Sequence, residues 1–200
     1  MNCRRLGIFT IVLFSAAVAS AAITPIGEFT GDLQEGFENI YSPGAYPGPI
    51  PFFGGFATMD DSLAHTVVIA YFWTGQGGDV YPYNGNLFAG GVAGSEIITF
   101  SSPIQQFGGF FTTVGPNPDG SVIFRDETGA TIDTLSMSVT PTQWGWQGWT
   151  SDVPFKSIEI IGNNVPGCST QLDDLQMSYV PEPAALGLIV LGAGLLMRRR

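Results

Sequence analysis

Basic side chains are scarce in this sequence. Only 7 of its 200 residues are lysine or arginine, and five of these lie within the first five or the last three positions. Between residues 22 and 179, Arg125 and Lys156 are outnumbered by 16 acidic residues, so two positive charges against 16 negative ones leave a formal charge of −14. A surface this anionic repels phosphate backbones, so we expect no nucleic acid among the partners. It suits an exported protein and the binding of cations.

Histidine and cysteine are scarcer still, which limits the possible chemistry. The chain has one histidine, His65, and two cysteines, Cys3 and Cys168. One histidine without a nucleophile motif does not indicate a catalytic triad. One histidine and one cysteine beyond the N-terminal segment cannot fill the three positions of a zinc site. Cys168 alone cannot form an internal disulfide.

Paired carboxylates are the remaining candidates for catalysis. They occur as Asp60-Asp61 and Asp173-Asp174, and glycosidases use two carboxylates about 5–10 Å apart across a cleft. Neighbours on a strand point to opposite faces of the sheet, so neither doublet supplies such a pair by itself. We therefore predict that the protein is not an enzyme. An exported glycan-active hydrolase is the alternative.

The first 21 residues predict a secretory signal peptide. Arg4 and Arg5 form its basic start, residues 6–18 form an apolar stretch, and an Ala-Ser-Ala sequence ends at Ala21. Small residues in this pattern are typical of a cleavage site, so we expect cleavage between Ala21 and Ala22. The secretion machinery is therefore an expected partner, and the protein is expected to be exported.

The C-terminal segment, residues 180–200, has three parts. It opens with two prolines around a glutamate: Pro181, Glu182 and Pro183. It ends with a basic cluster: Arg198, Arg199 and Arg200. Between them, residues 184–197 form an apolar run without charge or proline. This run is shorter than the ~20 residues that a spanning helix needs, but arginine side chains can snorkel and extend its reach. We expect a short hydrophobic helix here.

This arrangement resembles the PEP-CTERM sorting signal of Gram-negative bacteria, also known as the ice-binding protein C-terminal domain. The resemblance covers about a tenth of the chain. It implies recognition by an exosortase, a membrane protease-transpeptidase, and processing near the Pro-Glu-Pro tripeptide. It also implies transient anchoring in the inner membrane, followed by delivery to the cell surface or the extracellular matrix. It implies neither ice binding nor an activity for the rest of the chain.

Residues 22–179 predict one all-β domain. Short runs rich in β-branched and aromatic residues alternate with Gly, Pro, Asn and Asp, and no helical period appears. We expect about nine strands, at residues 33–40, 52–58, 66–73, 96–101, 104–114, 121–125, 131–139, 155–161 and 171–179. The run at 66–73 is apolar on both faces and predicts a central strand. Residues 126–129 predict a hairpin turn, and residues 42–51 and 115–120 predict loops. The expected fold is an antiparallel two-sheet β-sandwich.

Four short motifs in this domain resemble the galactose-binding-like jelly rolls found in many carbohydrate-binding modules. They are Gly36-Phe37-Glu38, residues 99–104, residues 149–158 and Leu172-Asp173-Asp174-Leu175. The resemblance implies that the first and last strands are neighbours and that Glu38, with Asp173 or Asp174, holds a structural calcium ion.

Strand alternation adds its own expectation for Asp173. It places Asp173 with Leu175 on an apolar face, where a carboxylate needs a cation or hydrogen-bond donors. A cation would make this a calcium site. The alternative is that Asp173 caps a neighbouring backbone segment and that Asp174 is solvated.

Aromatic residues give the second indication of a binding function. Trp144, Trp146 and Trp149 stand within six residues of one another. Sugars stack on flat indole faces, so the cluster predicts a carbohydrate-binding platform. Core packing is the alternative, because tryptophans that alternate on a strand bury well. Tyr81 and Tyr83, in a loop, form a second candidate pair.

The tail, the charge and the aromatic residues together predict an exported, non-catalytic surface or matrix protein. Its jelly roll is expected to bind extracellular polysaccharide or neighbouring surface proteins. A purely structural surface-layer component without a ligand is the further alternative to the hydrolase.

Overall fold

The computed structural model describes residues 23–39, 41–162 and 170–179. Several predictions concern residues outside these ranges: Ala21, Ala22, Cys168, Pro181, Glu182, Pro183, Arg198, Arg199, Arg200 and the short C-terminal helix. Within the described ranges, no helix is long and apolar enough to cross a membrane.

Fourteen strands and one short 3-10 helix make up the described part of the chain. The strands are β1 (Ile23–Pro25), β2 (Leu33–Glu35), β3 (Gly44–Pro47), β4 (Ile50–Phe52), β5 (Ala57–Asp61), β6 (Thr66–Ala70), β7 (Trp73–Gly75), β8 (Gly78–Val80), β9 (Phe88–Gly91), β10 (Glu96–Thr113), β11 (Asp119–Arg125), β12 (Thr131–Ser138), β13 (Gly145–Ile161) and β14 (Thr170–Tyr179). The 3-10 helix η1 spans Phe53–Gly55. The pairs between these strands are antiparallel.

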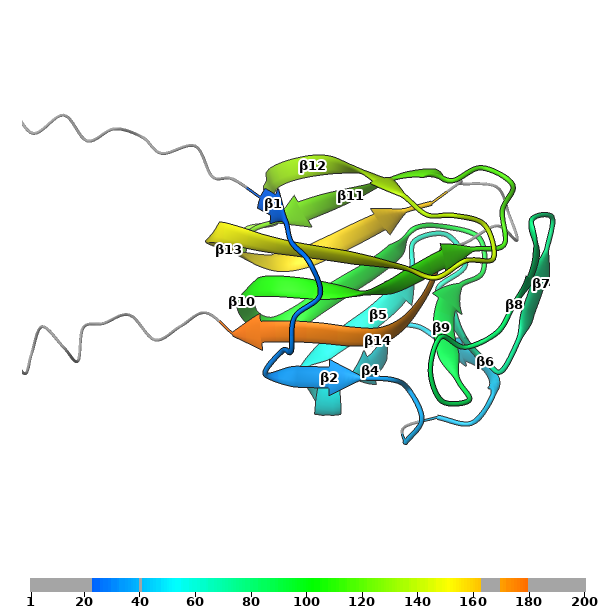
Figure 1. Ribbon diagram of the computed structural model, residues 1–200. Coiled ribbons are helices and arrows are strands. Elements are labelled where there is room, and N and C mark those ends of the chain that lie inside the picture. The colour runs from blue at the N-terminus through cyan, green and yellow to red at the C-terminus, as the bar shows by residue number, and fades with distance from the viewer. Residues whose placement is uncertain (1–22, 40, 163–169, 180–200) are drawn as a thin grey trace, which may run out of the picture.

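The strands form two layers that share their two longest strands, β10 and β13 (Figure 1). In the first layer the order is β12, β11, the second half of β13, the first half of β10, β5 and β4. In the second layer the order is β1, the first half of β13, the second half of β10, β14, β9, β6 and β3. β2 pairs with the remaining part of β14. Each long strand therefore bends from one layer into the other and joins them covalently.

The bends of β10 and β13 coincide with prolines. The ladder between these strands shifts register between Thr99 and Ile104 and again before Gln106. Pro103 lies in β10 at this point, and Pro154 lies in β13. Proline has no N–H for a ladder hydrogen bond, so the pairing is interrupted where the strands change layer.

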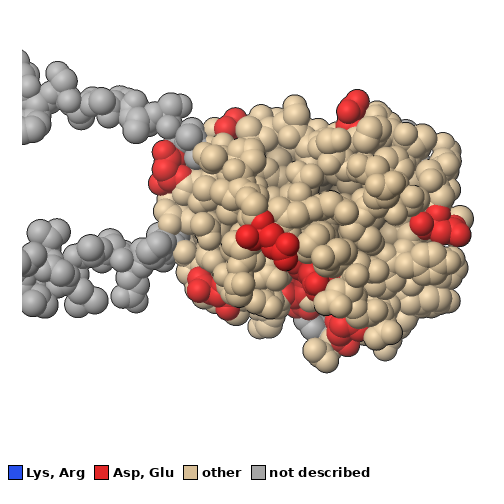
Figure 2. Space-filling view, viewed as in Figure 1, with Lys and Arg blue, Asp and Glu red and all other residues tan. Residues whose placement is uncertain are grey.

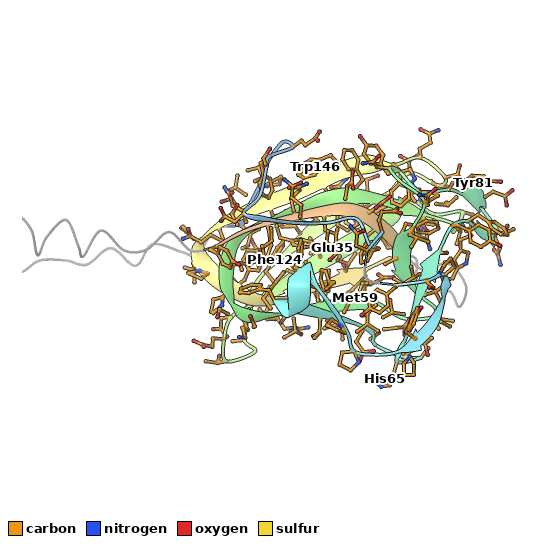
Figure 3. All side chains as sticks on the ribbon, turned by 90° about the horizontal axis from the view of Figure 1, so that it is seen from below. Glu35, Met59, His65, Tyr81, Phe124 and Trp146 are labelled. Atoms are coloured by element: carbon orange, nitrogen blue, oxygen red, sulfur yellow. The ribbon has the colours of Figure 1, made fainter. Side chains whose placement is uncertain are left out.

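The core lies between the layers and is built around phenylalanine. Phe100, Phe107, Phe124 and Phe155 are at most 1% exposed, and their rings meet edge to face at centroid distances of 5.2–6.1 Å. Such contacts add about 0.5–1.5 kcal/mol per pair to the free energy gained by burial. Figure 3 shows Phe124 and Met59 between the layers.

The first and last described strands end on the same side of the sandwich. Ile23 pairs with Ser151, and Tyr179 pairs with Ile104, close to the bends of the long strands. The hairpin of β7 and β8 lies at the opposite end of the molecule (Figure 1).

The predicted all-β fold, an antiparallel two-layer β-sandwich, is confirmed. The predicted turn at residues 126–129 is also confirmed, since it joins β11 to β12. The predicted strands at 96–101 and 104–114 are one strand, because Pro103 bends β10 without ending it. Residues 155–161 are likewise the second half of β13 rather than a separate strand.

Two further predictions need correction near the sheet edges. The run at 66–73 forms an inner strand as predicted, because β6 pairs with β9 on one side and β3 on the other, but the strand ends at Ala70 and residues 71–73 are not part of it. The stretch at 42–51 is not a plain loop, because it contains β3 and the start of β4. β3 and β4 are edge strands of their layers and contain Pro47 and Pro51. A proline is tolerated in an edge strand because its missing N–H can face away from the neighbouring strand.

Candidate functional site

The three clustered tryptophans are divided between the two faces of the sheet. Trp149 points into the core, is 2% exposed and meets Phe111 and Phe124 edge to face. Residues three apart on a strand face opposite sides, so Trp146 lies on the other side of β13. Trp144 comes just before β13 and packs against the buried Phe88 at 5.8 Å between ring centroids. Figure 3 shows Trp146 on the outer side of the sheet. Trp149 is therefore a core residue and takes no part in a surface platform.

The outer face of the second layer carries a series of aromatic rings in contact. Trp146 meets Phe29 at 5.8 Å and Phe110 at 5.4 Å between ring centroids. Phe110, on the neighbouring strand β10, is stacked against Tyr83 at 3.6 Å with 14° between the ring planes. Tyr83 meets Trp144 at 6.4 Å. Phe110 is only 9% exposed, whereas Tyr83 is 45% exposed, so the tyrosine forms the accessible surface here.

The inner face of the β7–β8 hairpin fixes it to the domain. Its register partners Trp73 and Val80 belong to a second, smaller hydrophobic cluster that also contains Phe88 and Val114. At the hairpin tip, the N–H of Gly77 donates to the carbonyl oxygen of Val114 at 2.6 Å. A Cβ on residue 75 would lie 2.5 Å from the Cβ of Val114, so the close approach requires a glycine there.

A second group of aromatic rings lies beside the β7–β8 hairpin. The rings of Phe72 and Tyr81 stack at 6.3 Å with 28° between their planes, and Tyr71 meets Phe72 at 5.1 Å. The exposed fractions are 59% for Tyr71, 43% for Phe72 and 61% for Tyr81. The indole N–H of Trp144 donates to the carbonyl oxygen of Tyr81 at 2.7 Å and so links the hairpin to the sheet face. We name the whole set the aromatic row: Phe29, Tyr71, Phe72, Tyr81, Tyr83, Phe110, Trp144 and Trp146.

A bulge in β14 brings Asp173 to this face. The pairing of β14 with β10 shifts register just before Phe110, and Asp174 has a φ of +45°. An extra residue in one strand reverses the alternation beyond it. Leu172 therefore joins Leu175 in the core, and Asp173 turns to the outer face opposite Phe110. The prediction that Asp173 shares the apolar face of Leu175 is wrong for this reason.

Asp173 and Asp174 hold the loop at residues 81–87, which carries both candidate tyrosines. Oδ2 of Asp173 accepts hydrogen bonds from the backbone N–H groups of Tyr83 at 2.9 Å and Asn84 at 3.2 Å. Oδ2 of Asp174 accepts one from the side-chain amide of Asn84 at 3.1 Å. The position of Tyr83 over Phe110 thus depends on these carboxylates.

Glu38 holds the other end of the same loop. Its Oε1 accepts hydrogen bonds from the backbone N–H groups of Asn86 at 2.5 Å and Leu87 at 2.7 Å. We name Glu38, Asp173 and Asp174 the loop clamp. Its three members come from the segment after β2 and from β14, so residues predicted to hold calcium are brought to one loop.

The loop clamp uses its oxygens on backbone donors. Burial raises the pKa of Asp173 to about 7, the charge of Asp174 acts in the same direction, and the three backbone hydrogen bonds act against it. Across the described residues, no group of three or more His, Cys, Asp or Glu side chains lies where it could hold a metal ion. Calcium bound by Glu38, Asp173 and Asp174 stays a prediction.

A second pair of buried carboxylates, Asp61 and Glu96, serves a different loop. Asp61 accepts hydrogen bonds from five backbone N–H groups, those of Leu63, Ala64, Val92, Ala93 and Gly94. Burial acts to raise the pKa of Asp61, but these bonds outweigh it and lower the pKa to about 2. Burial and the nearby charge of Asp61 raise the pKa of Glu96 well above its usual value. This pair holds the connection between β9 and β10 in place.

One pocket lies beside the bends of the long strands. Its volume is about 500 Å³, and it is lined by Pro103, Pro154 and the turn residues Asp126, Glu127 and Thr128. Oδ1 of Asp126 is engaged within its own turn, since it accepts hydrogen bonds from the N–H groups of Thr128 and Ala130. None of the pocket residues belongs to the aromatic row.

Four members of the aromatic row were not predicted from the sequence: Phe29, Tyr71, Phe72 and Phe110. Tyr71 and Phe72 belong to the apolar run at 66–73, in which every residue reads as part of a strand. The one available signal is the glycine cluster at 75–78, which marks a tight turn and makes the flanking residues partners in a hairpin. That pattern would have paired Phe72 with Tyr81.

Comparison with known proteins gives matches only among solved structures. No protein-family model and no curated protein sequence matches the chain. The xylan-binding domain CBM22-1 of Paenibacillus barcinonensis Xyn10C is 14% identical with a TM-score of 0.38, over 77% of this chain and 99% of that one. A family 6 carbohydrate-binding module is 17% identical with a TM-score of 0.35, over 61% of this chain and 86% of that one.

An enzyme is also among these matches. The isomalto-dextranase of Arthrobacter globiformis T6, complexed with panose, is 16% identical with a TM-score of 0.36, over 66% of this chain but 22% of that one. Identities and TM-scores this low transfer no ligand and no activity to this chain. A function must therefore be argued from the aromatic row itself.

Proposed function

We propose that this protein is an exported, non-catalytic surface or matrix protein that binds polysaccharide through the aromatic row. One observation carries the proposal: four rings, those of Tyr71, Phe72, Tyr81 and Tyr83, are 43–61% exposed and belong to two groups of contacting rings that the hydrogen bond from Trp144 to Tyr81 links. The apolar face of a sugar ring stacks on such rings, whereas exposed aromatic side chains are otherwise costly to leave in water.

The way the rings are held supports a binding role. The loop clamp fixes residues 81–87, and the indole N–H of Trp144 fixes the carbonyl group of Tyr81. Tyr83 is stacked on the nearly buried Phe110. A surface that is already ordered loses less conformational entropy when a ligand binds, which favours affinity.

Retention on a neutral polysaccharide in native affinity electrophoresis tests the binding site. We expect the domain to be retarded, and we expect Tyr81→Ala and Tyr83→Ala to weaken retention by about five- to 150-fold, since loss of one stacking ring costs roughly 1–3 kcal/mol. Tyr179→Ala is the matched control, because Tyr179 is 42% exposed but contacts Phe56 rather than the aromatic row.

The outcomes of this experiment separate the function classes. Equal loss of retention in the Tyr179 variant would contradict a site at the aromatic row. Release of reducing sugar ends by the wild-type domain would place the protein among hydrolases. If the domain is retained on no polysaccharide, the result would contradict polysaccharide binding and favour a structural surface-layer component without a ligand.

The export route is part of the same proposal. It rests on the signal-peptide pattern at residues 1–21 and on the three-part tail at residues 180–200. The inner-membrane anchor is transient, and an exosortase processes the protein near Pro181-Glu182-Pro183. Intact mass of the protein recovered from the cell surface checks this: a mature species that retains Arg198–Arg200 would contradict processing. Replacement of the tripeptide by alanines should leave the protein in the inner membrane.

A further inference from the structure

The outer face of the β7–β8 hairpin combines stacked rings with a carboxylate. Thr74 and Asp79 are register partners, and the hydroxyl of Thr74 donates to Oδ1 of Asp79 at 2.8 Å. Just beyond the last ladder pair, Trp73 and Val80, the rings of Phe72 and Tyr81 stack on each other, and alternation puts them on the face of Thr74 and Asp79. Same-face positions on a strand are about 7 Å apart, so the carboxylate and the ring pair lie within the length of one or two sugar units.

The charge around this face is of one sign. Figure 2 shows acidic side chains distributed over the visible surface. The two basic residues of the described ranges are engaged elsewhere, because Arg125 pairs with Glu159 at 2.7 Å and the ammonium group of Lys156 donates to the carbonyl oxygen of Ser101. A negatively charged ligand is therefore repelled from the aromatic row, and a positively charged group is attracted to it.

A protonated amine satisfies both features of the hairpin. An ammonium group near the ring faces of Phe72 and Tyr81 gains a cation–π interaction, and it can donate a charge-assisted hydrogen bond to the carboxylate of the exposed Asp79. A lysine-rich peptide would supply the charge without a flat apolar ring face for stacking. An amino sugar supplies both.

We propose that the outer face of the β7–β8 hairpin is a subsite for an amino sugar whose amine is unacetylated and protonated. Phe72 and Tyr81 contact the face of the sugar ring, and Asp79 accepts the hydrogen bond from its ammonium group. This subsite rests on the proposed polysaccharide binding by the aromatic row and gives it a specificity: glucosamine-type polymers before neutral ones, and neutral ones before uronates.

The test compares three soluble probes by titration calorimetry with the purified domain: a glucosamine oligosaccharide, its fully N-acetylated counterpart and an oligogalacturonate. We expect the glucosamine probe to bind about fivefold more tightly than the acetylated one, since one exposed charge contact contributes about 1 kcal/mol. The preference should shrink as salt is added. The oligogalacturonate should bind most weakly.

Two variants that each remove one negative charge separate a specific contact from general attraction. Asp79→Asn should abolish the preference, so that the glucosamine probe binds no more tightly than the acetylated probe. Glu127→Gln removes the same charge at the exposed 126–129 turn and should keep the preference. Melting curves check that both variants are folded.

Three results would overturn the subsite. These are an equal loss of preference in the two variants, equal affinity of the wild type for all three probes, and full competition by poly-lysine. In the second case the polysaccharide-binding proposal still stands. If none of the probes and no neutral polysaccharide binds, the proposed function fails first.

Discussion

Two loops of this domain are held by the same device, a fully buried aspartate that accepts hydrogen bonds from backbone N–H groups. Asp61 accepts five such bonds, and its pKa is lowered to about 2. Asp173 accepts three, lies next to Asp174, and its pKa is raised to about 7. Both side chains are 0% exposed. Zero exposure alone therefore does not set the charge state: Asp173 lies deeper among protein atoms, has an acidic neighbour and has fewer donors, and together these differences raise its pKa where that of Asp61 is lowered.

The two carboxylates should therefore hold their loops with different strength, Asp61 more firmly than Asp173. A buried carboxylate with five donors is a fixed charge at neutral pH, and the loop it holds is expected to be rigid. A buried carboxylate with three donors and an acidic neighbour is close to its titration point. The weaker anchor is the one that holds Tyr83, in the loop to which we assign binding.

Of the changes considered, removal of the Asp61 carboxylate should lower the stability of the domain most. Asp61→Ala leaves five backbone N–H groups without their acceptor, so we expect the free energy of unfolding to fall by about 4 kcal/mol. Urea denaturation with a constant m-value would measure this. A loss below about 1 kcal/mol would show that water replaces the carboxylate and that the anchor is not permanent.

Removal of the Asp173 carboxylate should cost less stability and more binding. We expect Asp173→Ala to lower the free energy of unfolding by about 2 kcal/mol and to weaken polysaccharide retention at least about tenfold, because Tyr83 loses its support. Asp61→Asn, assayed below its melting temperature, is the control and should keep retention. Equal retention by wild type and Asp173→Ala would remove the link between the loop clamp and binding.

The two aspartates should also move stability in opposite directions with pH. The folded pKa of Asp61 lies below its unfolded value, so its contribution is present above about pH 4 and is lost as the pH falls toward 2. The folded pKa of Asp173 lies above its unfolded value, so its contribution is present below about pH 4 and is lost as the pH rises through about 7. Glu96 acts in the same direction as Asp173.

Melting temperatures between pH 3 and pH 8 test these signs. We expect a maximum near about pH 4–5 and a decline in melting temperature toward pH 8, because the pKa values of Asp173 and Glu96 are raised in the folded state. Asp173→Asn should flatten this decline. An identical pH profile in wild type and variant would contradict the assignment to Asp173.

Calcium should change the stability of the domain less than either aspartate substitution or the change of pH. A cation at the loop clamp must replace hydrogen bonds that the carboxylates already make, so we expect calcium to raise the melting temperature by only about 1–3 °C. Glu38→Ala should remove the rise, while Asp61→Asn should keep it. Identical melting curves in calcium and in chelator would exclude the site.

The sequence predicted the fold class because strand signals are local. β-branched and aromatic runs between glycines and prolines mark strands wherever they pack, and the 126–129 turn follows from its own residues. The continuity of β10, which joins two predicted strands, could not be predicted from such local signals. A proline usually interrupts a strand, and only the partner strand β13, which bends at the same point, shows that Pro103 does not end this one.

The sequence predicted only part of the site. Side chains alternate between the two faces of a strand, and the sequence alone does not say which face is buried. Trp144, Trp146, Tyr81 and Tyr83 lie on the aromatic row, but Trp149 does not, because odd and even positions of β13 face opposite sides. Which side is the core depends on the other layer, which is far away in sequence. The bulge at Asp174 moved Asp173 to the outer face, and a bulge leaves no mark in the sequence beyond a residue that tolerates positive φ.

The placement of the first and last described strands on one side of the sandwich has a consequence for avidity. Ile23 and Tyr179 lie close to the bends, while the hairpin with Phe72, Asp79 and Tyr81 lies at the far end (Figure 1). Molecules held in an array by either of these strands would all direct their hairpins outward. A polymer that spans neighbouring copies would then meet a high effective concentration of sites. Weak contacts at single hairpins would add up to firm adhesion, and an isolated domain in solution would underestimate it.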